Sequence, residues 1–417
     1  MVRQGYKQTE IGEIPEDWEV VHLGEKGFFK KGKGIKKDEI IDNGISCIRY
    51  GEIYTQYNNF TEKLKSYIPI EISKQSQPIK KGDLLFAGSG ETAEEIGKCV
   101  AYTGSELAFA GGDIIIFTPN EGDSKYLGYL MNNEIIVNQK SRMGQGDAVV
   151  HIYSSHIKDV FLPFPDTKEQ STISQVLSYT DNLIEKLDKL IEKKKNIKQG
   201  AMQELLTGKK RLPGFDGEWE VNILKKMVQT PITDGPHMTP KFISKGVPFL
   251  SVNNLVNNKI DLTDLRFISK EDDIIFSKKC KPKENDILIG KAASVGMVGI
   301  VEFDLDFNIW SPLALVRLKL DYSPKYVYYS FQTSSLLNQI KLLTNSSSQG
   351  NIGMGDIEKL EFKIPSNSKE QQAIAQILSD MDAEIDELER KRDKYKLLKL
   401  GMMQQLLTGK IRLPWKN

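Results

Sequence analysis

The sequence predicts an α/β (α+β) fold that is written twice, with two mixed α/β globular parts separated by two long helices. Three observations carry this prediction. The chain has 417 residues, which is enough for two or three domains. A segment near the middle of the chain recurs at its end, and both copies have the heptad pattern of a long helix. The stretch before each copy combines strand-like and helix-like patterns of apolar residues.

The first globular part is expected to span residues 1–165. Apolar runs predict strands over residues 45–50 and 113–117. A helix is predicted over residues 124–140, because its apolar residues recur every three or four positions. Turns are expected at glycine-containing pairs such as Gly111-Gly112. This combination of elements indicates a mixed α/β part.

The first long helix is expected within residues 166–211. Thr167-Lys168-Glu169-Gln170 has the spacing of a capping box and follows a proline-ended strand, so it predicts the start of the helix. Gly208 and Pro213 are typical stop signals. A helix over residues 168–206 would be about 58 Å long at roughly 1.5 Å per residue. The apolar seam of a coiled coil is predicted at Ile173, Leu177, Thr180, Ile184, Leu187 and Ile191.

The second half of the chain repeats this layout. A second globular part is expected over residues 212–366, with a strand over 313–318 and a helix over 324–343, and a second helical segment over 367–417. The two helical segments are identical at more than half of their aligned positions, at a constant spacing of 201 residues. The second apolar seam is predicted at Ile374, Leu378, Met381, Ile385 and Leu388.

The two helices are expected to pair with each other, because each has an apolar stripe that it cannot bury alone. The second globular part starts where the first helix ends and finishes where the second helix begins. Since the termini of a domain usually lie close together, the helices should run antiparallel. This arrangement predicts a pseudo-two-fold axis, with one globular part at each end of a rod.

Composition narrows the classes of function. With 57 Lys+Arg against 56 Asp+Glu the net charge is +1, so binding of a polyanion has to come from local patches. The chain has no apolar run of about 18 residues, and its first residues are too polar for a signal peptide. The three distant cysteines exclude a disulfide framework and a zinc ribbon, and the four histidines lack metal-ligand spacing. We therefore expect a cytoplasmic protein with no metal and no membrane contact.

Three features together carry a resemblance to a known family. Residues 14–20 read Ile-Pro-Glu-Asp-Trp-Glu-Val. Leu-Leu-Thr-Gly-Lys occurs at 205–209 and again at 406–410, each followed by Arg-Leu-Pro, and the half-chain is duplicated. The chain thereby resembles, over essentially its whole length, the DNA-specificity (S) subunit of type I restriction–modification systems.

This resemblance implies two target recognition domains, at 1–165 and 212–366, and two conserved helical spacers, at 166–211 and 367–417. It implies a non-enzymatic subunit without a cofactor that reads a bipartite sequence in double-stranded DNA. It also implies partners, namely two methyltransferase (modification) subunits and the restriction–translocation subunits that dock on them. Because the two recognition domains differ in sequence, the two half-sites should differ as well.

A lysine-rich stretch near the N-terminus is the first candidate for DNA contact. Six lysines fall within a dozen positions around three glycines, which predicts a flexible cationic loop suited to phosphates. The alternative is a solvated surface loop. The candidate residues are Lys30, Lys31, Lys33 and Lys36.

Arg49-Tyr50-Gly51-Glu52 follows the first predicted strand and is a candidate for reading bases. Arginine can bind a guanine edge with two hydrogen bonds, and glutamate can accept one from a cytosine amine. Each such contact contributes about 1–3 kcal/mol of discrimination. The alternative is a structural pair between Arg49 and Glu52.

The second globular part offers its own set of short polar side chains near glycine and proline. Such side chains supply the donors and acceptors that base edges need, although they can also serve only to cap turns. The candidates are Asp234, His237, Thr239 and Lys241 in one loop and Ser251 and Asn253 in the next. Further candidates follow two matched strands, namely Ser89, Glu91 and Thr92, and Lys291 and Ser294. Gln145 and Gln349 lie in glycine-flanked loops, and glutamine suits adenine.

Enzymatic functions find little support in the sequence. Phe86-Ala87-Gly88-Ser89-Gly90 matches a short methyltransferase pattern, but the tetrapeptide that holds a flipped base is missing. Pro165-Asp166 and Glu192-Lys193-Lys194 imitate a nuclease motif, yet the second part lies in the predicted coiled coil. No phosphate-binding loop of an ATPase is present. The remaining alternative is a duplicated coiled-coil adaptor that binds proteins without DNA specificity.

Overall fold

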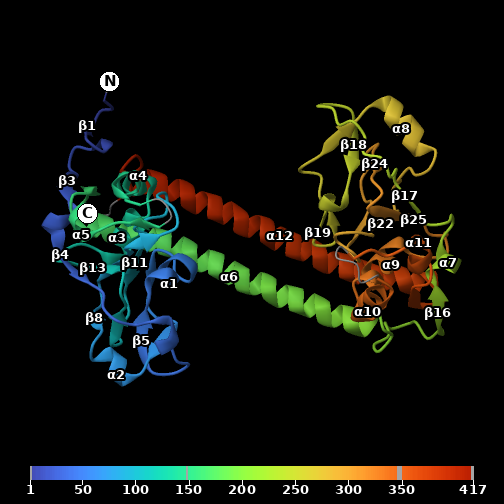
Figure 1. The fold of residues 1–417 in the computed structure, drawn as a ribbon, viewed down its shortest axis with the longest axis horizontal. Coiled ribbons are helices and arrows are strands. Elements are labelled where there is room, and N and C mark those ends of the chain that lie inside the picture. The colour runs from blue at the N-terminus through green and yellow to red at the C-terminus, as the bar shows by residue number, and fades with distance from the viewer. Residues whose placement is uncertain (1, 147–148, 345–349, 415–417) are drawn as a thin grey trace. The chain divides into compact units, whose positions relative to one another are not determined.

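The structure is a computed structural model, and it describes residues 2–146, 149–344 and 350–414 (Figure 1). The chain divides into two compact units. Unit 1 comprises residues 1–188 and 390–417, and unit 2 comprises residues 189–389. Each unit therefore contains one α/β part, the beginning of one long helix and the end of the other. Below, module 1 is the α/β part of unit 1, and module 2 is the α/β part of unit 2.

Module 1 contains a five-stranded and a four-stranded sheet. The five-stranded sheet has the order β4 (Gly27–Lys31), β13 (Ile114–Pro119), β9 (Leu84–Ala87), β11 (Cys99–Tyr102) and β6 (Phe60–Thr61). The four-stranded sheet has the order β7 (Ser66–Ile68), β5 (Ile45–Ile48), β12 (Ala108–Ala110) and β8 (Gln77–Ile79). Two-stranded pairs are β1 (Tyr6–Thr9) with β2 (Gly12–Pro15), β3 (Glu19–His22) with β15 (Phe161–Phe164), and β10 (Ser89–Gly90) with β14 (Val150–His151). Its helices are α1 (Tyr50–Thr55), α2 (Ile70–Ser73), α3 (Ser124–Met131), α4 (Glu134–Met143), α5 (Ser154–Ile157) and the 3-10 turns η1 (Leu23–Lys26) and η2 (Lys37–Glu39).

Module 2 has a four-stranded and a three-stranded sheet. The first has the order β17 (Thr233–Asp234), β25 (Leu313–Val316), β22 (Ile287–Gly290) and β23 (Val298–Ile300). The second has the order β21 (Arg266–Ile268), β18 (Val247–Leu250) and β24 (Asn308–Ile309). Two-stranded pairs are β16 (Trp219–Ile223) with β26 (Glu361–Pro365) and β19 (Leu255–Val256) with β20 (Lys259–Ile260). Its helices are α7 (Leu224–Met227), α8 (Lys270–Ser277), α9 (Pro324–Phe331), α10 (Ser334–Leu343), α11 (Met354–Ile357) and the 3-10 turn η3 (Val252–Asn254).

The sheets confirm that the chain is duplicated. In both modules the larger sheet is antiparallel along the equivalent strands β4-β13-β9-β11 and β17-β25-β22-β23. In both, the smaller sheet pairs one central strand with a parallel and an antiparallel neighbour. The mixed α/β prediction is therefore correct for both halves. The expected strand over 45–50 is shorter than predicted, because a helix begins at Tyr50.

Each predicted helix in the modules is in fact two helices. The expected helix over 124–140 is broken between α3 and α4, and the one over 324–343 between α9 and α10. At both breaks a polar side chain caps the second helix, since Asn133 accepts from the amide of Ile135 and Thr333 from the amide of Leu336. Such side chains compete with the helical backbone, so the apolar spacing continues across a turn.

The long helices α6 (Thr167–Leu205) and α12 (Ser368–Leu406) have 39 residues each. The capping box predicted at Thr167 is wrong, because α6 is capped one residue earlier, and α12 is capped at the equivalent residue. Asp166 accepts hydrogen bonds from the amides of Lys168 and Glu169, and Asn367 accepts one from the amide of Lys369. A carboxylate or amide oxygen at this position satisfies the free N–H groups of the first turn.

The antiparallel direction of the helices is confirmed within each unit. In unit 1, Asp181 binds Lys399 at 2.6 Å and Asp188 binds Arg392 at 3.5 Å. In unit 2, Lys198 binds Asp382 at 2.6 Å and Lys195 binds Glu389 at 2.6 Å. As the residue number rises on one helix, it falls on the other. The predicted seam is mostly buried, with half-buried positions at Ile184, Met381 and Leu388.

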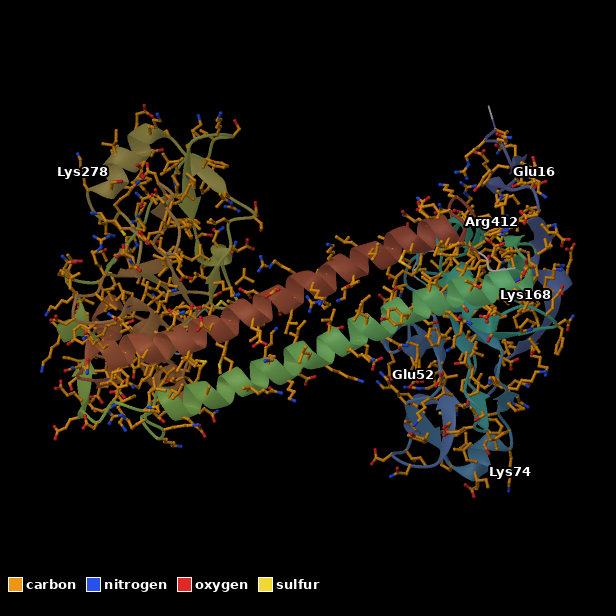
Figure 2. The ribbon with its side chains drawn as sticks, turned by 180° about the vertical axis from the view of Figure 1, so that it is seen from behind. Glu16, Glu52, Lys74, Lys168, Lys278 and Arg412 are labelled. Carbon is orange, nitrogen blue, oxygen red and sulfur yellow. The ribbon has the colours of Figure 1, made fainter. Side chains whose placement is uncertain are left out.

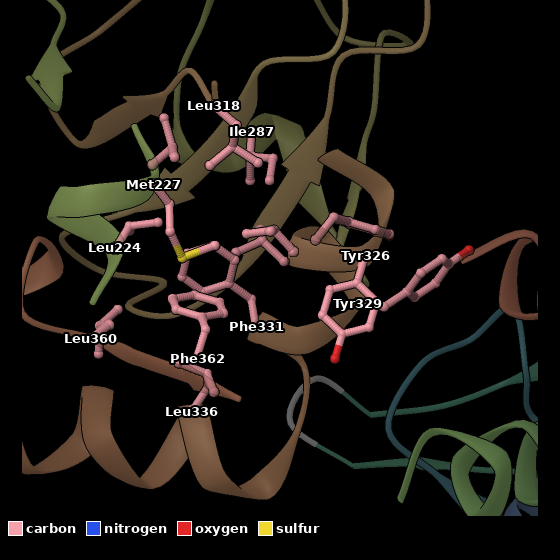
Figure 3. Packing of buried hydrophobic residues seen from close by; sticks show 14 of the residues in the cluster. Leu224, Met227, Ile287, Leu318, Tyr326, Tyr329, Phe331, Leu336, Leu360 and Phe362 are labelled. Atoms are coloured by element: carbon pink, nitrogen blue, oxygen red, sulfur yellow. The ribbon is translucent and has the colours of Figure 1, made fainter. Parts of the chain in front are cut away.

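The seam is not reserved for the helix pair. Ile173 and Leu177 of α6 belong to the core of module 1, which also contains Leu406 and Leu407 from the end of α12. In unit 2 the same relation holds for Ile374, Leu378 and the end of α6, in the core that Figure 3 shows around Phe331 and Phe362. Each module is therefore completed by both helices. The sequence pattern predicted the buried face but not the module that shares it.

Candidate nucleic-acid interface

The repeated sequence motifs form a clamp between the ends of the two helices. In unit 1, Arg412 donates to both oxygens of Glu169 at 3.0 and 2.7 Å, and Trp18 donates to the same carboxylate at 2.9 Å. Arg412 follows the end of α12, and Lys168 marks the beginning of α6 in Figure 2. In unit 2, Arg211 donates to both oxygens of Glu370 at 2.7 and 2.9 Å. Both glutamates are buried.

The glutamines of the Lys-Glu-Gln motif hold the modules against the helices. Gln170 accepts from the amide of Asp123, which caps α3, and Gln371 accepts from the amide of Ser323, which caps α9. A second link is repeated in both units. The hydroxyl of Tyr129 donates to Asp181 at 2.5 Å in unit 1, and that of Tyr329 donates to the equivalent Asp382 in unit 2. These links fix each module on its helices, so its loops project from a rigid base.

The lysine stretch of module 1 is only partly a loop. Lys30 and Lys31 lie on β4, an edge strand of the five-stranded sheet, and Lys36 precedes the 3-10 turn η2. Lys33 lies between them, and all four side chains are exposed. The prediction of one flexible loop is therefore wrong for its first half, because the edge strand orders it. Contact of these lysines with DNA remains a prediction.

The Arg49-Tyr50-Gly51-Glu52 motif starts helix α1. Glu52 is buried and accepts hydrogen bonds from the Arg49 amide at 2.8 Å and from the hydroxyl of Ser66. The Arg49 guanidinium lies 3.4 Å from the same carboxylate, and Tyr50 is exposed. Glu52 thus orients Arg49, which is the structural pair considered as the alternative. The arginine keeps donors that Glu52 does not use.

The loop after β9 brings two distant side chains together. Ser89 is buried, and its Oγ lies 2.9 Å from Nδ1 of His151. The backbones of these residues pair between β10 and β14, and Gln145 forms a bridge to the same histidine. Glu91, Thr92 and Gln145 are exposed. His151 was not among the predicted residues, because it lies 62 residues from Ser89 and no local pattern connects the two.

A buried lysine closes this loop. Lys140 on α4 is 1% exposed, and its Nζ donates to the carbonyl of Gly97 at 2.5 Å. Burial lowers the pKa of Lys140 to about 8. Gly97 has a φ of +70°, and its amide returns to Ala87 at the end of β9. In module 2 the amide of Gly296 returns in the same way to the end of β22, and an apolar side chain, Ile340, packs there instead.

The most charged cluster of module 2 surrounds Asp234. This residue has 0% exposure, and its carboxylate accepts hydrogen bonds from Lys279 and, at 2.5 Å, from Lys291. His237 lies 3.3 Å away and is exposed. Burial would raise the pKa of Asp234, but the hydrogen bonds of both lysines outweigh it and hold the pKa below its ordinary value. Lys279 was not among the sequence candidates.

The other candidates of module 2 lie in exposed loops or near them. Ser251 follows β18 and caps η3, while Asn253 is exposed within that turn. Lys291 and Ser294 follow β22 as predicted and are half-buried. Thr239 and Lys241 are exposed. Gln349 lies outside the described residues. Contact of these residues with DNA remains a prediction.

The described residues form neither a metal-binding cluster nor a membrane-spanning helix, and their cysteines are free thiols. Among the described residues no group of three His, Cys, Asp or Glu could hold a metal ion. None of the described helices is long and apolar enough to cross a membrane. The three free cysteines are buried, and burial raises the pKa of Cys47 and of Cys99 to about 12. A thiol with so high a pKa is a poor nucleophile.

Comparison with known proteins agrees with this architecture. The model of the "Type I restriction modification DNA specificity domain" matches the chain twice, over residues 15–197 and 218–396. A putative type I restriction enzyme MjaX specificity subunit from Methanocaldococcus jannaschii is 27% identical over 98% of this chain and 97% of its own length. The type I restriction enzyme EcoKI specificity subunit from Escherichia coli is 22% identical over 97% of this chain and 91% of its own.

Solved structures share the fold. The S subunit of a type I restriction–modification system from M. genitalium superposes with a TM-score of 0.61 and 14% identity, over 93% of this chain and 96% of that one. A chain from a study of the assembly and conformational transition of the type I R-M system gives a TM-score of 0.55 and 16% identity, over 95% and 99%.

Proposed function

Because the chain belongs to the family of type I restriction–modification DNA specificity domains, we propose that it reads a bipartite, asymmetric target in double-stranded DNA. Recognition of a DNA target is the function that this family membership supports. Each module reads one half of the target, and the two halves are unlike. The alternative of an adaptor without DNA specificity has no support in the relatives, which are named specificity subunits.

The observation that carries the bipartite proposal is a shared framework with different side chains on it. Equivalent strands, clamps and helix caps occur in both modules. The loops that follow equivalent strands differ between the modules. The loop of module 1 carries Ser89, Glu91 and Thr92, whereas the corresponding loop of module 2 is shorter and carries Lys291 and Ser294. Base edges are distinguished by the donors and acceptors offered to them. Modules with different loop side chains therefore read different sequences.

Two of the candidate residues act through their neighbours in this proposal. The carboxylates of Glu52 and Asp234 are buried and already bonded. Glu52 orients Arg49 for a guanine edge, and Asp234 orients the two lysines that bind it. The exposed candidates contact DNA directly, and the lysines of β4 serve the phosphates.

The partners also belong to the proposal. We infer that the chain holds two methyltransferase subunits, on which restriction subunits dock, and that it performs no catalysis itself. The helical spacers, proposed at 166–211 and 367–417, are the docking elements. Exposed apolar side chains at the end of α12, such as Leu397 and Leu400, support this assignment because such patches favour protein contacts. A cytoplasmic location fits the three free cysteines.

The test is methylome sequencing of cells that carry this chain with its cognate methyltransferase subunit. The expected result is methylation at two short unlike words separated by a fixed gap. A catalytically inactive methyltransferase subunit controls for host methylation. Loss of all sequence preference, or methylation at one uninterrupted word, would contradict the proposal.

A further inference from the structure

Equivalent positions in the two modules carry opposite charges. Lys31 on β4 pairs with Ile115, and Asp234 on β17 pairs with Ala314. Both partners pair in turn with the next strand, β9 or β22, one residue before that strand ends. Lys31 and Asp234 therefore occupy the same place in the duplicated sheet.

The residue after β9 or β22 also differs between the modules. Gly88 donates its amide to the carbonyl of Asp113 at 2.7 Å, and Lys291 donates its amide to the carbonyl of Pro312 at 2.7 Å. In both modules the returning strand then donates an amide to the same residue at 3.0 Å. Gly88 and Lys291 are therefore equivalent, and module 1 has no side chain where module 2 has a lysine.

These two differences change which charged groups lie beside the end of β9 in module 1 and of β22 in module 2. In module 2 the ammonium groups of Lys279 and, at 2.5 Å, of Lys291 both bind Asp234, so the module supplies the anion for its own cations. In module 1 the cation is Lys31, and no side chain at Gly88 occupies the space beside it. A cavity of about 200 Å³ lies there, lined among others by Lys30, Lys31 and Gly88.

The polar groups around the cavity favour an anion. Lys30 and Lys31 form no ion pair among the described residues, and one carboxylate, Asp113, lies at the rim and is exposed. Ser89 and His151 also line the cavity. Their hydrogen bond uses Nδ1 of the histidine and does not involve Nε2. Because no carboxylate of the described residues pairs with Lys31, its ammonium keeps donors that suit phosphate oxygens, whereas both lysines around Asp234 are already ion-paired.

We propose that this cavity of module 1 binds a phosphate group of the DNA backbone, and that the internal pair of Asp234 and Lys291 excludes such a contact from the equivalent place in module 2. The proposal rests on the DNA-reading function inferred above. It makes the two modules unequal, because module 1 holds the backbone at a place where module 2 satisfies its own charges.

The first experiment measures the salt dependence of DNA binding by the full chain with its methyltransferase subunits. The probe is a duplex that carries the target found by methylome sequencing, with a scrambled duplex beside it. Lys31→Ala should lower the slope of log affinity against log salt by about 1, as expected for one lost phosphate contact. Lys125→Ala is the matched control, because it removes a lysine that pairs with Glu62 outside the cavity. Its slope should equal that of the unchanged protein.

A second experiment identifies the source of the phosphate. Single neutral methylphosphonates are placed along the half-site that module 1 reads. One position should weaken binding by the unchanged protein and have no effect on Lys31→Ala. His151→Asn, which introduces the residue that module 2 has at the paired position Asn351, should reduce the same effect without unfolding the chain.

The outcomes separate the two proposals. If the unchanged protein does not prefer the target over the scrambled duplex, the proposed function fails. If it prefers the target but Lys31→Ala keeps the full salt slope and the full methylphosphonate effect, only the phosphate site fails. Inorganic pyrophosphate can also be added as a competitor of the duplex. If Lys31→Ala changes the inhibition by pyrophosphate but not the methylphosphonate effect, the cavity takes free phosphate, and the assignment to DNA is overturned.

Discussion

In unit 1 the clamp glutamate, Glu169, is bound by Arg412 and by Trp18, whereas in unit 2 its counterpart, Glu370, is bound by Arg211 alone among the described side chains. The indole N–H of Trp219 is buried and has no partner among the described residues. The arginine–glutamate pair is thus kept in both units, whereas the hydrogen bond from the tryptophan is present only in unit 1 among the described residues. The same rule holds at larger scale, since sheets and helix caps persist while the loops on them diverge.

The largest effect should come from exchanging a whole module. Replacing residues 1–165 by the corresponding part of another family member should change one half of the DNA target and leave the other half unchanged. The reason is that the clamp and the glutamine links to the helices are repeated, so a foreign module finds the same supports. Methylome sequencing of cells with the hybrid reads the result. An unchanged target, or a change in both halves, would contradict independent modules.

Removing the clamp arginines should sharpen the difference between the units. Arg211→Ala leaves the buried Glu370 without the one cation that binds it among the described residues, and we expect a loss of about 2–3 kcal/mol in the free energy of unfolding. Arg412→Ala should cost less, because Trp18 still donates to Glu169. Denaturant unfolding of the full chain measures both. Equal losses, or a larger loss for Arg412→Ala, would show that the tryptophan contact carries no weight.

Lys140 in module 1 and Ile340 in module 2 occupy equivalent places, but only Lys140 should make stability depend on pH. Burial lowers the pKa of Lys140 to about 8 from 10.5, so the charged form is disfavoured in the folded state. The stability of unit 1 should therefore rise as pH increases from 8 toward 10.5. Lys140→Met should be about 1 kcal/mol more stable at pH 7 and lack this rise. Ile340→Met in module 2 is the control, and its stability should show no such change with pH.

The smallest expected effect is on the acid dependence of stability, through Asp234. The hydrogen bonds of Lys279 and Lys291 hold the pKa of Asp234 below 3.8 against the effect of burial. Its contribution to stability is present above pH 3.8 and is lost as pH falls through the lower folded value. Asp234→Asn should lower stability at pH 7 and flatten the acid dependence, as followed by unfolding at a series of pH values. Module 1 has Lys31 at this place, so Lys31→Asn should leave the acid dependence unchanged.

Most of the architecture could be predicted because it repeats and because it follows local rules. The heptad spacing predicted α6 and α12, and the constant offset between the halves predicted two similar modules. The errors were local competitions between polar side chains and the backbone. Asp166 caps α6 in place of Thr167, and Asn133 ends a helix that the apolar spacing continues.

The candidate interface could be predicted only in part, since its pairs join distant residues. Strand ends indicated Ser89 and Lys291, and both follow strands as expected. The pairing of these residues has no signature in the sequence, because His151 lies 62 residues from Ser89, and Asp234, although a candidate itself, lies 57 residues from Lys291. Burial of Glu52 and Asp234 also could not be read from polar residues in a loop motif.

The completion of unit 1 by Leu406, Leu407 and Arg412 has a consequence for synthesis of the chain. Module 1 leaves the ribosome well before the side chains that close its core and neutralise Glu169 have been made. In a nascent chain the core of module 1 therefore stays incomplete until residues 406–412 have been synthesised. Products cut short near residue 400 would keep that defect and be more open to proteolysis.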